Sequence, residues 1–128
     1  MATLENKTIL VIGATGGLGR HFVQQLGESG AVVISASSSD VNLENAESIE
    51  RFAKHVLTNH GSVDGIVLAS GLVAFGSIAE TPAEVRERLM RVNFLGQVDL
   101  VSALLPALTS SAESGNAPFV LSISGVIA

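Results

Sequence analysis

The sequence contains no cysteine, no tryptophan and no tyrosine, and only 15% of its residues are charged. Without cysteine there is no disulfide framework and no thiolate metal site, and we expect no metal centre. Seven Lys and Arg stand against twelve Asp and Glu, which gives a net charge of -5. Nucleic-acid binding needs clustered cations on a basic surface, so we expect no nucleic-acid partner. The 47% of hydrophobic residues suffices for a folded core.

The chain also lacks the start of a secreted protein and any long apolar run. Residues 1–7 are polar and include Glu5, so they do not resemble a signal peptide. Every apolar run is far shorter than the roughly 20 residues that span a bilayer. We therefore expect a cytoplasmic protein with no membrane partner, folded as a single domain over residues 1–128.

Short apolar runs alternate with segments of helical periodicity along the chain. This alternation predicts an α/β fold in which a parallel sheet is covered on both faces, a Rossmann-type doubly wound sheet. The predicted strands are residues 8–12, 31–36, 41–43, 65–69 and 118–124, so the chain ends after a fifth strand. The predicted helices are residues 20–27, 46–60 and 84–108, the last starting at a Thr81 cap, bending near residues 93–96 and weakened near its end by Pro106. Residues 110–117 are expected to form a surface loop.

A glycine-rich segment links the first predicted strand to the first helix. Gly13 suits a tight turn, Gly17 allows a pyrophosphate to approach the backbone, and Gly19 allows close helix packing. The helix N-terminus then offers free amides to phosphates. The whole segment is the predicted cofactor-binding loop, and its members are Gly13, Thr15, Gly16, Gly17, Leu18 and Gly19. The alternative is a glycine-rich turn without a ligand.

The spacing G-x-x-x-G-x-G resembles the loop of the short-chain dehydrogenase/reductase family, T-G-x-x-x-G-x-G, with Ile12 in place of the family Thr. Two further segments extend the resemblance. Leu68-Ala69-Ser70-Gly71 stands where the family has N-N-A-G, which implies that Ala69, Ser70 and Gly71 form a wall of the adenine and ribose site. An ordinary strand-to-loop turn is the alternative. Both family Asn residues are missing, so their sheet-stabilising hydrogen bonds must be replaced or absent. Asn42 and Leu43 match a family pair that contacts the adenine, although a plain turn is the alternative.

The resemblance also implies two catalytic candidates. Asn93, in the segment R-V-N-F-L-G, matches a family Asn that supports a proton relay from within a distorted helix. A solvent-facing Asn is the alternative. The family's catalytic Ser follows the fifth strand. The best local match places Gly125 on that position and Ser124 one residue earlier, so Ser124 is either a catalytic residue or a strand-end cap.

The family's catalytic Tyr-x-x-x-Lys is not found, because the chain contains no Tyr. We expect the printed chain to be part of a longer oxidoreductase that transfers hydride between a nicotinamide and an alcohol or carbonyl substrate. The alternative is a non-catalytic nucleotide-binding or regulatory module. Apolar residues between Glu84 and Leu108 exceed the needs of one core face, which suggests a homodimer or homotetramer formed through this helix. The alternative is that these residues are buried on both sides within one chain.

The cofactor preference depends on the residues that follow the second strand. They carry neither the acidic residue typical of NAD sites nor the Arg typical of NADP sites. Ser37 and Ser38 offer hydroxyls to a 2′-phosphate, and Asp40 would repel it if its side chain points inward. The sequence favours NADP(H), with NAD(H) as the alternative.

Overall fold

A four-stranded parallel sheet forms the centre of the protein in a computed structural model that describes residues 3–124. Its strands are β1 (Thr8–Ile12), β2 (Val32–Ala36), β3 (Gly65–Leu68) and β4 (Phe119–Ser122), in the spatial order β2-β1-β3-β4. Both β1 and β3 lie inside the sheet, and every residue of β3 is buried. The apolar, β-branched composition of these two strands follows from that position. The predicted doubly wound fold is confirmed.

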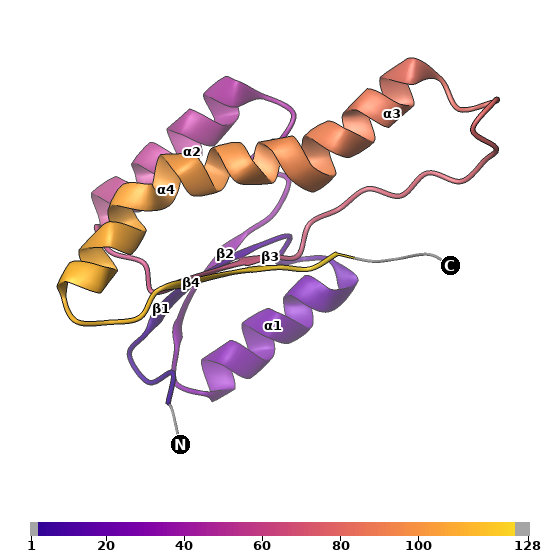
Figure 1. The fold of residues 1–128 in the computed structure, drawn as a ribbon. Coiled ribbons are helices and arrows are strands. Elements are labelled where there is room, and N and C mark those ends of the chain that lie inside the picture. The colour runs from indigo at the N-terminus through magenta and orange to yellow at the C-terminus, as the bar shows by residue number, and fades with distance from the viewer. Residues whose placement is uncertain (1–2, 125–128) are drawn as a thin grey trace.

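Helices cover the two faces of the sheet (Figure 1). Helix α1 (Gly17–Glu28) covers one face, and α2 (Ala46–His60) and α4 (Gly96–Glu113) cover the other. Successive side chains of a strand point to opposite faces, so Ile9 and Val11 pack with α1, whereas Leu10 and Ile12 pack in the larger core beneath α2 and α4.

The third helical segment is continuous but irregular. Helix α3 (Ala83–Met90) passes into a π-helical turn, η1 (Arg91–Leu95), which leads into α4. This confirms the predicted distortion near Asn93. Helix α4 continues through Pro106 to Glu113, because its buried face, which includes Leu104 and Leu108, holds it against the core.

Four local predictions are wrong. Residues 41–43 form no strand. Instead Val41 and Leu43 turn their side chains into the core from an irregular link, so β2 is an edge strand and the described sheet has four strands, not five. Half of the expected loop at 110–117 is helical, because α4 continues to Glu113, where the Ser111 hydroxyl bonds Asp64 Oδ1 at 2.6 Å. Helix α1 begins three residues earlier than expected. Thr81 does not cap α3, because its hydroxyl donates to the Ser77 carbonyl at 2.8 Å.

The helical stretch Ala83–Glu113 has the length and apolar composition of a membrane-crossing helix, with a mean hydropathy of 1.3 over its most apolar window. The core helix of a soluble protein passes the same test. Here 39% of that window is buried inside the protein, where α4 packs against α2 and β3.

Candidate functional site

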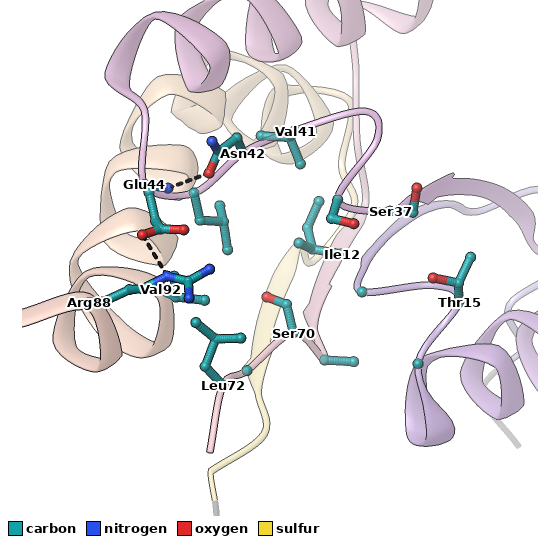
Figure 2. Close-up of a pocket in the computed structure, with 16 residues that line it drawn as sticks. Ile12, Thr15, Ser37, Val41, Asn42, Glu44, Ser70, Leu72, Arg88 and Val92 are labelled. Atoms are coloured by element: carbon teal, nitrogen blue, oxygen red, sulfur yellow. Dashed lines mark hydrogen bonds and ion pairs between the residues drawn. The ribbon is translucent and has the colours of Figure 1, made fainter. Parts of the chain in front are cut away.

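A cavity of about 470 Å³ opens at the carboxyl ends of β1, β2 and β3 (Figure 2). In open α/β sheets this edge is the usual place for ligands, because the loops that follow parallel strands meet there. Its wall comes from the glycine loop, the β2–α2 link, the segment after β3 and the α3–η1 helix. The lining residues are Ile12, Gly13, Thr15, Gly16, Ser37, Ser38, Val41, Asn42, Leu43, Glu44, Ala69, Ser70, Gly71, Leu72, Arg88 and Val92.

The glycine loop has the geometry that its spacing predicts. Gly13 has a φ of +81°, and a Cβ added to it would lie 2.7 Å from the backbone nitrogen of Ser70. A Cβ on Gly19 would overlap the Gly13 carbonyl, so glycine allows α1 to start directly against the loop. A Cβ on Gly17, by contrast, would meet no protein atom within 4 Å. The fold therefore does not require glycine at residue 17.

The first turn of α1 is open to an anion. The helix begins at Gly17, and its N-cap residue is Gly16, which has no side chain to bond the free amides. The first amides of a helix have no partner inside the helix and carry the positive end of its dipole. This helix start therefore suits a phosphate group.

The turn after β2 is organised around a carboxylate. Asp40 Oδ2 accepts hydrogen bonds from the Ser37 amide at 2.8 Å and from the Ser37 hydroxyl at 3.2 Å. The same hydroxyl accepts from the Ser39 amide at 3.2 Å. Asp40 thus points back toward the end of β2, and the Ser37 hydroxyl is already bonded within the turn.

The link that follows holds Asn42 and Leu43 beside the cavity. The side-chain oxygen of Asn42, Oδ1, accepts a hydrogen bond from the backbone N–H of Glu44 at 3.0 Å. The backbone N–H of Asn42 donates to the Ser48 hydroxyl at 2.9 Å. Leu43 is 5% exposed, and its carbonyl lies where a Cβ on Gly96 would be. Glycine at 96 therefore allows the distorted helix to approach the link.

Side chains from the distorted helix hold the segment after β3. The side-chain amide of Asn93 pairs with the Leu72 backbone. It accepts from the Leu72 N–H at 2.7 Å and donates to the Leu72 carbonyl at 2.9 Å. Gln97 donates to the Ser70 carbonyl at 3.0 Å and accepts from Ser122 on β4 at 3.4 Å. These bonds fix the backbone of the segment after β3, where Leu68 and Ala69 have no polar side chain. The Ser70 hydroxyl oxygen is buried, and no described residue bonds it.

Ten of the thirteen predicted cofactor-binding residues line the cavity. The other three, Gly17, Leu18 and Gly19, form the first turn of α1 beside it. Neither catalytic candidate lines the cavity. Asn93 binds the Leu72 backbone, and Ser124 is exposed just after β4. Gly125 lies outside the described residues.

Sequence reasoning missed several members of the site. Gln97 carried a signal, because it is a polar residue that follows Asn93 by four positions in the same helical stretch. The structure shows that it is 5% exposed. Glu44 and Arg88 carried no such signal, because they are far apart in the chain and meet only in the fold. There Arg88 Nε lies 2.9 Å from Glu44 Oε1. In the part of the chain that the structure describes, no group of three His, Asp or Glu side chains could hold a metal.

The chain is similar to known proteins in both sequence and structure. A family model described as short chain dehydrogenase matches residues 35–128. The chain is 27% identical to a Drosophila melanogaster dehydrogenase/reductase SDR family protein 7-like over 150 aligned residues, covering 98% of this chain and 46% of that protein. The chain thus spans about half the length of such relatives.

Solved structures show the same fold. A Streptomyces avermitilis short-chain dehydrogenase superposes with a TM-score of 0.83 at 27% identity, over 94% of this chain and 50% of that one. A 3-ketoacyl-(acyl-carrier-protein) reductase from Brucella melitensis, complexed with NADH, superposes with a TM-score of 0.88 at 18% identity. The match covers 96% of this chain and 59% of that one.

Proposed function

Because the chain belongs to the short-chain dehydrogenase family, we propose that it is the cofactor-binding part of an NAD(P)-dependent oxidoreductase. The reaction is hydride transfer between the nicotinamide and an alcohol or carbonyl substrate. The observation that carries this proposal is the open first turn of α1, which adjoins a cavity large enough for a nucleotide at the carboxyl edge of the sheet.

The residues present fit such a cofactor. The first amides of α1 bind the pyrophosphate, and the empty space beside Gly17 admits it without a steric clash. The walls formed by Asn42 and Leu43 on one side and by residues 69–71 on the other hold the adenosine. The nicotinamide, when bound, supplies the hydride acceptor or donor.

The proton needed by the reaction has no donor of the family type within this chain, which contains no Tyr. We assign the Tyr-x-x-x-Lys pair to further residues of a longer protein. Asn93 supports the proton relay from its place in η1 by holding the Leu72 backbone. Ser124 follows β4 at the same edge of the sheet as the cavity. The missing Tyr also favours a second candidate, a nucleotide-binding module without catalysis.

The proposed cofactor preference rests on the charge of Asp40. The sequence favoured NADP(H) on the strength of the serine hydroxyls, but the Ser37 hydroxyl is bonded to Asp40. The Asp40 carboxylate is held beside the Ser37 amide just after β2, where its charge repels a 2′-phosphate. We therefore propose that the site binds NAD(H) more tightly than NADP(H).

We propose a homodimer or homotetramer formed through the long helix between Glu84 and Leu108, in a cytoplasmic protein that binds neither nucleic acid nor membranes. Large apolar side chains are exposed along this helix, as expected for a contact surface. They are Met90, Phe94, Leu95, Val98 and Leu105.

Titration of the chain with NADH and NADPH tests the cofactor assignment. Since the protein contains no Trp or Tyr, the fluorescence of the reduced nicotinamide is measured without protein background. We expect saturable binding, tighter for NADH. If neither nucleotide binds at millimolar concentration, the assignment is wrong. The coding sequence beyond residue 128 tests the enzyme proposal: we expect Tyr-x-x-x-Lys within about 20 residues, and its absence would favour the binding module.

A further inference from the structure

A second cavity lies at the opposite edge of the sheet from the cavity of Figure 2. It has a volume of about 210 Å³ and adjoins the residues at which β1, β3 and β4 begin. Because the strands are parallel, their amino ends share one edge of the sheet, and the larger cavity opens at the carboxyl ends. The connection from α4 to β4 lies at this amino edge (Figure 1). The proposed cofactor site makes no use of this second cavity.

Two opposite charges line this second cavity without pairing with each other. Lys7 comes directly before β1, and Asp64 comes directly before β3. The Lys7 ammonium donates to the side-chain oxygen of Asn116, which is a neutral partner. Neither Lys7 nor Asp64 belongs to an ion pair with another residue of the described range 3–124. The cavity therefore presents a cation and an anion, each with its charge uncompensated by the other.

Hydrogen bonds fix the half-buried Asp64 carboxylate in place. Its Oδ2 accepts from the backbone N–H of Thr8 at 2.8 Å, and its Oδ1 accepts from the Ser111 hydroxyl at 2.6 Å. These bonds hold the carboxylate between the start of β1 and the end of α4. A carboxylate oxygen can accept from more than one donor, and an ammonium has more N–H groups than its bond to Asn116 uses. Both charged groups can therefore bind a ligand without giving up their present partners.

Apolar side chains form the rest of the wall. They include Leu4 from the segment before β1, Ile9 on β1 and Phe119 on β4. The Phe119 ring lies against the sheet because residue 65 is glycine: a Cβ there would come within 2.4 Å of the ring. The ring is nevertheless 38% exposed, so it offers apolar surface to a ligand. The cavity holds roughly seven times the volume that a water molecule takes in the liquid, which suits a molecule of the size of an amino acid.

We propose that this second cavity binds a free α-amino acid with an apolar side chain, such as leucine. The carboxylate of the ligand accepts from Lys7, and its ammonium donates to Asp64. Its side chain packs against Leu4 and Phe119. A zwitterion satisfies both charges of the cavity at once, whereas a simple anion is repelled by Asp64 and a simple cation by Lys7. The site lies at the other edge of the sheet and does not depend on the proposed cofactor binding.

The test compares leucine with two analogues that each lack one of its charges. 4-Methylpentanoate lacks the ammonium, and 3-methylbutylamine lacks the carboxylate. Titration of the ¹⁵N-labelled chain is expected to shift the backbone amide signals of Asp64 and Phe119, with a dissociation constant for leucine on the order of 1 mM. Each analogue loses one hydrogen bond between charged groups and binds roughly 10- to 100-fold more weakly. This comparison needs no variant, so it does not depend on how a substitution affects folding.

A lysine substitution tests the placement of the ligand. Lys7→Met keeps an apolar stem but removes the charge, and it weakens leucine binding by a similar factor. The matched control is Lys54→Met, which changes the other lysine of the chain, on the exposed surface of α2, and keeps the wild-type affinity. Melting curves verify that both variants stay folded. The inference is overturned if either analogue binds as tightly as leucine, if Lys7→Met binds leucine as the wild type does, or if roughly 20 mM leucine shifts neither amide signal.

Discussion

Replacement of Gly17 by alanine separates the needs of the fold from those of a bound dinucleotide. An added Cβ meets no protein atom within 4 Å, and the residue lies in the first turn of α1. Alanine restricts the unfolded chain more than glycine does, so the substitution stabilises the protein by about 0.4–1 kcal/mol. For a chain of this size the melting temperature rises by about 2–4 °C.

The same Cβ occupies the space that we assign to the pyrophosphate. Crowding of this kind is unfavourable by about 1–3 kcal/mol, which is roughly a 5- to 150-fold loss of NADH affinity. Gly17→Ala therefore makes the protein more stable and a weaker binder. No defect in folding produces both effects together.

Gly27 provides the matched control. It lies in the last turn of the same helix, and a Cβ there also meets nothing within 4 Å. Gly27→Ala is expected to raise the melting temperature similarly and to leave NADH affinity unchanged. Thermal unfolding followed by circular dichroism and titration of nucleotide fluorescence measure the two quantities. NADH affinity that is equal in wild type and Gly17→Ala would refute the placement of the pyrophosphate.

Three further substitutions test other parts of the site. Gly19→Ala forces a Cβ onto the Gly13 carbonyl and should destabilise the protein by about 3 kcal/mol in urea unfolding; wild-type stability would contradict this close packing. Asn93→Ala removes both bonds to the Leu72 backbone and should lower the free energy of unfolding by about 1–2 kcal/mol, with Ser102→Ala on exposed α4 surface as control. Asp40→Ala removes the charge beside β2 and should raise the affinity for NADPH relative to NADH about 10-fold in low salt; an unchanged ratio would show that Asp40 does not select the cofactor.

Sequence patterns predicted those parts of the fold in which local chemistry and tertiary packing agree. The apolar β-branched run at 8–12 is a buried central strand, and the periodic segment 46–60 is helix α2, ended by Gly61. Where local chemistry and tertiary packing disagree, the sequence patterns gave wrong predictions. Pro106 weakens a helix locally, yet α4 continues because the core holds its other face.

The β2–α2 link shows the same limit more sharply. The apolar side chains of Val41 and Leu43 predicted a strand, but no strand within residues 3–124 pairs with the link, and these side chains fill the core from an irregular backbone. A strand needs a neighbour to bond its backbone, and a single sequence does not reveal whether that neighbour is present.

The sequence by itself determined the glycine loop, because steric limits on Cβ at Gly13 and Gly19 leave few other residues possible there. It also determined the alternation of strands and helices, except for the strand expected at 41–43, since apolar periodicity is a local property of the chain. Only the tertiary structure decided which polar groups meet at the cavity. The Asp40 carboxylate turns toward β2, Gln97 reaches the end of β3, and Glu44 meets Arg88, and each contact depends on how separate elements pack against one another.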